Sequence, residues 1–306
     1  MTEDDLTPED KIYKLDGISI PKWIVITVIV MFLGFFLNFP ISKMITSQVK
    51  KSLDSMRTCP ISYDKIEVEY FFFPKVILKN PTVSGICFQN PSAALKFKEL
   101  MIRLWFPSFL PPGIRFHIPI KYEKSEIDIY PTLTFGKLHL NIKDAKIDGK
   151  LLEILTGKLK NIHGTIEVNA IANIDKAGPA SGELLVKSKD LVIGPQNISG
   201  LAVPNLPLRS LLIKAELERP RLTLLDVIIG DDKSPLKANM KGEIKLNMKH
   251  VPSSGLDIDG NVFFGQDFLS SFGILNLFLA GKQTGKDGSY PIKIQGTFMR
   301  PAPSIK

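Results

Sequence analysis

The sequence predicts a mainly β protein that begins with a single transmembrane helix. Two observations carry this prediction: an uncharged apolar segment near the N-terminus, and a long alternation of apolar and polar residues from residue 60 onward. Within the alternating part, only two segments have helical periodicity instead. The 306 residues are therefore expected to form a membrane anchor and one large β-rich domain, residues 59–306.

The anchor is predicted over residues 20–41. No charged residue lies between Lys22 and Lys43. A helix over this segment is about 30 Å long, which matches the hydrocarbon core of a bilayer. A cleaved signal peptide is the alternative, but its apolar region would be shorter and would end at an Ala-x-Ala-like site, which is missing after Asn38. We therefore expect an uncleaved span.

The segments on either side of the span have different characters. Residues 1–19 are predicted to be a short tail, and residues 42–58 an amphipathic juxtamembrane helix in which Met44, Ile45, Val49 and Leu53 share one face. Lysines flank the span on both sides, so the positive-inside rule does not decide its orientation.

Period-two alternation is clearest over residues 166–174, 211–217 and 236–248. Gly, Pro, Asn and Asp separate such segments, as turns require. Strands with one apolar face need a cover for that face. Two sheets closing as a sandwich or barrel would provide it, and so would a ligand lying in the groove of one long twisted sheet.

The segment 236–248 supplies the candidate lining residues of such a groove. Ala238, Met240, Ile244 and Leu246 should share one face, opposite Lys237, Asn239 and Lys245. If the groove is open, these four side chains are expected to contact the ligand. If the domain is closed, they are expected to lie in its core.

Two short helices are predicted among the strands. The first covers residues 151–159. The second covers residues 267–280, where Asp267 is placed to cap a face that includes Phe268, Leu269 and Leu275. Two short helices can cover only a small part of a long sheet.

No catalytic, metal-binding or cofactor-binding constellation is predicted. The four histidines are isolated from potential partner ligands in the sequence. Gly281–Lys286 is one residue short of a phosphate-binding loop and continues with Asp287 where a hydroxyl residue should bind magnesium. We therefore expect a protein that acts by binding and not by catalysis.

The charge distribution indicates what such a protein binds. The formal net charge is +8, but residues 1–22 contain six acidic residues and three lysines, so the remaining chain is strongly basic. A basic domain beside a bilayer is attracted to anionic headgroups or to an acidic partner. Nucleic acid is not expected as a partner, because the lysines alternate singly with apolar residues and no nucleic-acid-binding motif is present.

Cys59 and Cys87 are the only cysteines, and they are expected to form a disulfide. An anchored domain can reach an oxidising compartment, where an even pair of cysteines is normally bonded. The alternative is two buried thiols in a cytosolic domain. A bond would close a loop of roughly 29 residues and stabilise the fold by about 3 kcal/mol on the loop-entropy estimate.

Several stretches resemble one known family. Residues 59–74 (CPISYDKIEVEYFFFP), 77–81 (ILKNP), Cys87-Phe88 and 111–116 (PPGIRF) are similar to the start of the periplasmic part of type II secretion system protein N. Residues 288–303 (GSYPIKIQGTFMRPAP) resemble the closing strand of that family and of the wider AsmA-like group. The likeness consists of aromatic, proline and glycine positions and contains no catalytic signature.

The resemblance implies a Gram-negative inner-membrane protein with a cytoplasmic N-terminus and a periplasmic domain. It also implies an accessory part in exporting folded proteins, with other secretion-system subunits as partners. The AsmA-like kinship implies a curved, mostly antiparallel sheet with an apolar groove, and it makes lipid binding or lipid transfer the alternative function.

Overall fold

The computed structural model describes residues 20–38, 41–56, 59–69, 74–88, 90–91, 93–105, 107–109, 111–157, 159–198, 201–248, 250–271, 275, 279–285 and 287–305. The chain divides into two compact units, Met1–Gln48 and Val49–Lys306. The predicted tail, residues 1–19, lies outside the described residues.

Two helices precede the strands. Helix α2 spans Ile20–Asn38, and its described side chains from Trp23 to Met31 are exposed. Helix α3 spans Ile41–Ser55, so the predicted amphipathic helix begins one residue earlier and ends before residue 58. Within the part of the chain that the structure describes, no helix combines the length and the hydropathy needed to cross a membrane.

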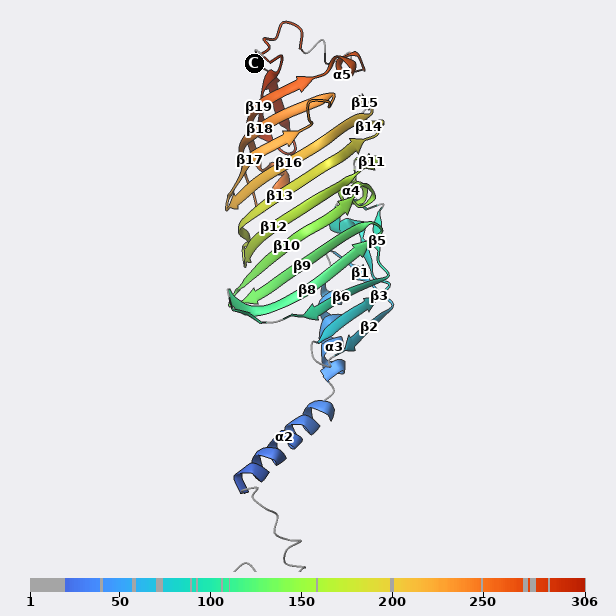
Figure 1. Ribbon diagram of the computed structural model, residues 1–306, viewed down its shortest axis with the longest axis vertical. Helices are drawn as coiled ribbons and strands as arrows, with labels where there is room; N and C mark the ends of the chain where they lie inside the picture. Colours follow the sequence, from blue (N-terminus) through green and yellow to red (C-terminus); the bar gives the residue numbers. More distant parts are fainter. Residues whose placement is uncertain are drawn as a thin grey trace, which may run out of the picture. The chain divides into compact units, whose positions relative to one another are not determined.

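The second unit is built on one large antiparallel sheet, which confirms the mainly β prediction (Figure 1). Fourteen of its strands form a single path in chain order, so that each strand pairs with its neighbours along the sequence. They are β2 (Lys65–Glu69), β3 (Lys75–Lys79), β6 (Glu99–Leu104), β8 (Pro112–Tyr122), β9 (Ser125–Thr134), β10 (Lys137–Asp148), β12 (Thr165–Asp175), β13 (Gly178–Ile193), β16 (Leu206–Glu218), β17 (Arg221–Ile229), β18 (Leu236–Lys245), β19 (Gly255–Phe264), β20 (Tyr290–Thr297) and β21 (Pro301–Ile305).

The remaining strands are short. β7 (Ser108–Phe109) pairs with β8, and β11 (Ile162–His163) pairs with β13. β1 (Ile61–Ser62), β4 (Thr82–Ser84) and β5 (Ala94–Lys96) form a three-stranded sheet, and β14 (Gln196–Ile198) pairs with β15 (Leu201–Val203). Among the described residues no second sheet approaches the size of the first, so the sandwich alternative is not the fold that forms.

Helix α4 spans Gly149–Thr156 and α5 spans Gln266–Ser271, with short 3-10 turns η2 (Gly85–Phe88) and η3 (Val251–Ser253). α4 begins before the predicted Leu151 because Asp148, the last residue of β10, caps it by accepting a hydrogen bond from the Leu151 N–H. It ends before Leu159 because Gly157 takes a left-handed conformation. α5 already includes Gln266, so Asp267 lies inside the helix and not at its N-cap position. Of the predicted face, Phe268, Leu269 and Leu275 are described, whereas residues 272–274 and 276–278 lie outside the described residues.

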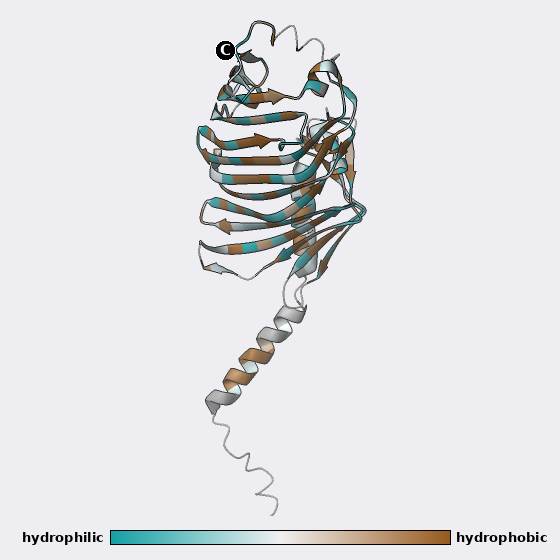
Figure 2. Ribbon diagram, turned by 45° about the horizontal axis from the view of Figure 1, so that its top comes forward, coloured by the Kyte–Doolittle hydropathy of each residue, from teal (hydrophilic) through white to brown (hydrophobic). Residues whose placement is uncertain are grey.

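Each strand of the main sheet has an apolar side and a polar side, because successive side chains point in opposite directions. In β18 the residues with even numbers are all apolar or glycine, and the lysines all have odd numbers. Cross-strand register extends this division to the neighbouring strands. We call the two sides of the sheet the apolar face and the polar face. Figure 2 shows the resulting alternation of hydrophobic and hydrophilic residues along the strands.

A compact core covers one end of the apolar face. Buried residues from β11, β12, β13, β16 and α5 pack together there, with α4 and β15 against them: Ile162, Ile166, Leu191, Leu206, Leu208 and Phe268. Figure 1 shows α4, β11, β14 and β15 near the same ends of the strands. This core covers only one end of the sheet, and the greater part of the apolar face lies beyond it.

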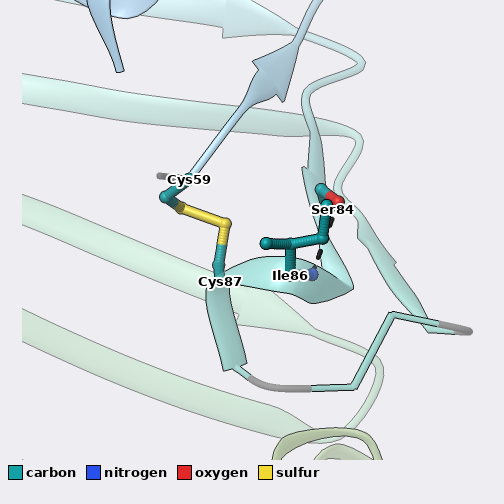
Figure 3. Close-up of a disulfide and its surroundings, with 4 residues drawn as sticks. All are labelled: Cys59, Ser84, Ile86 and Cys87. Carbon is teal, nitrogen blue, oxygen red and sulfur yellow. Dashed lines mark hydrogen bonds between the residues drawn. A yellow bond between two sulfur atoms is a disulfide. The ribbon is translucent and has the colours of Figure 1, made fainter. Parts of the chain in front are cut away.

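The disulfide between Cys59 and Cys87 is present, as predicted (Figure 3). It joins the segment before β1 to the turn η2 across a sequence separation of 28 residues. Ser84 supports the same turn, because its Oγ accepts a hydrogen bond from the Ile86 N–H at 3.4 Å. The bond therefore ties the start of the second unit to its small three-stranded sheet.

Candidate functional site

The candidate functional site is the apolar face of the main sheet. One row of directly opposed residues crosses ten consecutive strands, from β8 to β20, and every member is apolar or glycine. We call it the central row; it consists of Ile118, Ile129, Ile142, Ala170, Leu184, Ala215, Leu224, Gly242, Ile258 and Ile294. With strands about 4.8 Å apart, this row is about 43 Å long.

The central row is not packed like a protein core. Ala215 is its one fully buried member, while Leu184 remains 36% exposed and the others are partly exposed. At the β8–β9 end of the same face, Ile114 and Leu133 are 54% and 48% exposed. Among the described residues, these strands contact chiefly their neighbours in the sheet, and no second layer lies along the row.

The structure places three of the four predicted lining residues on this face. Ala238 lies opposite Val262, Met240 opposite Gly260, and Ile244 opposite Leu256. Ala238 and Ile244 are buried, and Met240 is partly exposed. Lys237, Asn239 and Lys245 lie on the polar face, as their alternation predicts.

Leu246 lies outside the strand, so the predicted strand over residues 236–248 is too long. β18 ends at Lys245. The Leu246 N–H instead donates to the Pro220 carbonyl, at 2.7 Å, in the turn before β17. This bond continues the register of Arg221 with Lys245, but Pro220 has no N–H to return a second hydrogen bond, so the ladder ends here.

The polar face carries several ion pairs between neighbouring strands. Lys293 Nζ lies 3.1 Å from Asp257 Oδ1, and Lys241 Nζ lies 3.2 Å from Asp226 Oδ1. The hydrogen bond to Asp257 raises the pKa of Lys293, and the same bond lowers the pKa of Asp257. The two faces of the sheet thus differ: one is apolar and sparsely covered, and the other carries charged side chains that are largely exposed.

The fold also brings histidines into contact with polar partners that sequence reasoning missed. His117 Nε2 lies 2.7 Å from Asp128 Oδ1, and the Nδ1 of His139 contacts the Oδ1 of Asn173. The sequence held no signal for these pairs, because they depend on strand register. No three or more His, Cys, Asp and Glu side chains of the described residues gather closely enough to hold a metal ion.

The fold and the site define a class: a mainly β chain organised around a single long antiparallel sheet with one apolar face. No protein family, curated protein or solved structure matches the chain.

Proposed function

We propose that this protein binds lipid acyl chains along the apolar face of its sheet, without catalysis. The observation that carries the proposal is the central row: ten strands of apolar residues and glycine in register, most of them partly exposed. Leaving so much apolar surface in water is unfavourable by roughly 25 cal/mol per Å². An acyl chain removes that surface from water without requiring specific hydrogen bonds.

We further propose that residues 20–41 anchor the protein in the bacterial inner membrane and that the β-rich domain lies in the periplasm. The absence of charge between Lys22 and Lys43 supports the anchor. The disulfide supports an oxidising compartment for the domain. A tethered domain stays close to its source of lipid, so a weak affinity for each acyl chain is sufficient.

Two variants on adjacent strands test the lipid proposal. Leu184 of β13 lies in the central row and is 36% exposed, whereas Ile171 of β12 lies on the polar face and is 39% exposed. Leu184→Asp places a charge where acyl chains would lie, and Ile171→Asp is its matched control. We expect mass spectrometry of the purified proteins to find co-purifying lipid in the parent and in Ile171→Asp, and a strong loss of lipid in Leu184→Asp.

A third variant separates lipid contact from folding. Ile244 is only 6% exposed, so Ile244→Asp buries an unpaired charge and should unfold the domain, whereas Leu184→Asp should remain folded by circular dichroism. A parent protein free of lipid, or equal lipid in Leu184→Asp and Ile171→Asp, would contradict the proposal.

A second candidate function is a structural part in the type II secretion system, as the resemblance implies. The observation that favours it is the free edge of the sheet at β2, which pairs with β3 on one side only among the described strands. An extended segment of another secretion subunit can add to such an edge.

Gene deletion distinguishes the two functions. A secretion role predicts that a folded substrate accumulates in the periplasm of the deletion strain, and that a protein lacking residues 1–42 restores export poorly. Normal secretion together with altered outer-membrane permeability would leave lipid binding as the function.

A further inference from the structure

The polar face of the sheet contains a second candidate site, separate from the apolar face. A cavity of about 470 Å³ opens over β8, β9 and β10, within the range of roughly 300–1,000 Å³ that is usual for small-ligand sites. Its lining includes Trp105, Arg115, Asp128, Tyr130, His139 and Asn141. Asp128 and Tyr130 flank Ile129 of the central row in sequence, so their side chains project to the opposite side of the sheet.

Aromatic rings form a rigid wall of this cavity. The His117 ring stacks on Tyr130 with centroids 4.7 Å apart, and Trp105 meets His117 edge-on at 5.5 Å. The bond from His117 Nε2 to Asp128 Oδ1, at 2.7 Å, fixes both the imidazole and the carboxylate. Ring faces and a carboxylate are thus held in place before any ligand arrives.

Hydrogen bonds behind the cavity orient two further side chains. Arg115 Nη2 donates to Ser108 Oγ at 2.9 Å. The His139 Nδ1 contacts the Oδ1 of Asn173; because an amide oxygen only accepts, Nδ1 is the donor of this pair. The lining therefore offers both donors and acceptors from side chains of fixed orientation.

The charges of the lining balance. Arg115 and Lys143 are cationic, and Asp128 and Asp144 are anionic. A site for a phosphate or a carboxylate needs an excess of positive charge. Hydroxyl groups, in contrast, both donate and accept, and the apolar C–H faces of sugar rings lie well against aromatic side chains. We infer that this cavity binds a neutral saccharide.

An adjoining cavity extends the site. It measures about 410 Å³ and shares Asn141, Lys143 and Asp144 with the first cavity, while Ile171 and Leu185 add apolar surface. The ligand is therefore an oligosaccharide of at least two rings, with one ring beside Trp105 and Tyr130.

The tryptophans of the chain provide a direct assay. Trp23 and Trp105 are the only two, so the full-length Trp23→Phe variant reports on Trp105 alone. We would titrate this protein with maltose, lactose and N,N′-diacetylchitobiose while recording tryptophan fluorescence. A saturable change is expected with at least one of these disaccharides. In the same background, Asn141→Ala should weaken that binding about tenfold, because a ligand hydrogen bond is lost.

Controls make the outcome decisive. Asn239→Ala removes an exposed asparagine from the same face at β18 and should leave the affinity unchanged. Ile258→Asp, a change in the central row that lines neither cavity, should also leave it unchanged, so this inference and the lipid proposal fail independently. The inference is overturned if no disaccharide gives a saturable change, if Asn141→Ala and Asn239→Ala behave alike, or if inorganic phosphate gives the same change and competes with the sugar.

Discussion

At the scale of single residues, a buried polar pair joins the strands to a helix. Asp148 Oδ1 accepts hydrogen bonds from Ser125 Oγ at 2.7 Å and from the Leu151 N–H at 3.1 Å. The Asp148 N–H in turn donates to Ser125 Oγ at 2.9 Å. Both residues are buried, so their polar atoms depend on each other and on the α4 N-terminus for hydrogen bonds.

Asp148→Ala should therefore lower the free energy of unfolding by about 1–3 kcal/mol, because it removes a helix cap and leaves Ser125 with one partner fewer. Asp148→Asn is the matched control, since it retains an acceptor oxygen, and it should cost clearly less. Denaturant unfolding followed by circular dichroism measures both. Equal losses for the two variants would show that the carboxylate charge, and not the hydrogen bonds, is what matters.

The ion pair between Arg219 and Asp175 predicts a pH effect. The Arg219 side chain, and then the Ala177 N–H, donate to the Asp175 carboxylate and hold its pKa below the usual range. A lowered pKa in the folded state stabilises the fold above the pKa of the unfolded chain, and this contribution is lost as the pH falls through the folded value.

We expect Arg219→Gln to raise the pKa of Asp175 toward its usual value, and Arg221→Gln, a nearby exposed arginine, to leave it unchanged. Carboxyl NMR titration measures both shifts. An unchanged pKa in Arg219→Gln would mean that the Ala177 N–H alone accounts for the lowering.

At the scale of elements, the two edges of the sheet are unequal. Just before β21, the Arg300 N–H donates to the carbonyl of Thr297, the last residue of β20. The backbone N–H groups of residues 300, 302 and 304 therefore face β20, and Pro301 and Pro303 face outward. Proline has no N–H, and the outer edge of β21 is therefore poor in donors for another strand. Strand addition is favoured at the β2 edge instead.

The double variant Pro301→Val/Pro303→Val supplies the missing outward N–H groups and should make the protein self-associate. Ala302→Val, which changes an inward-facing position, is the control and should remain as dispersed as the parent. Sedimentation velocity over a range of concentrations distinguishes the two. Unchanged sedimentation of the double variant would mean that the prolines do not protect this edge.

The disulfide acts on one small part of the domain. Replacing Cys59 and Cys87 with serine should lower the stability of the segment around β1, β4 and β5 by about 3 kcal/mol, because the unfolded loop regains its freedom. Hydrogen exchange should show faster exchange there and little change from β12 onward. Uniformly faster exchange across all strands would instead indicate that the bond stabilises the whole sheet.

The strands were predictable where alternation is local. Residues 166–174 and 211–217 fall within β12 and β16, and the sides taken by Ala238 and Ile244 follow from their parity alone. Register was not predictable. Irregularities such as the one between Ile142 and Ala145 shift the pairing in some strand pairs. The central row and the His117–Asp128 pair both depend on which residues of neighbouring strands come to lie opposite each other.

At the scale of the whole molecule, the proposed anchor governs where the domain works. We expect the protein to resist alkaline extraction from membranes, and added protease to digest the β-rich domain only from the periplasmic side. Release by alkaline carbonate would exclude the anchor. Digestion of the domain from the cytoplasmic side would reverse the proposed orientation.

Because strand order follows chain order, the width of the sheet across its strands is set by the number of strands that the gene encodes. Each added hairpin would lengthen the apolar face by about 10 Å without changing the pairing of any existing strand except at the point of insertion. Duplication or deletion of one hairpin thus changes the sequence little and changes the length of the apolar face by a fixed amount. Homologous chains with longer or shorter apolar faces should therefore differ by whole strand pairs.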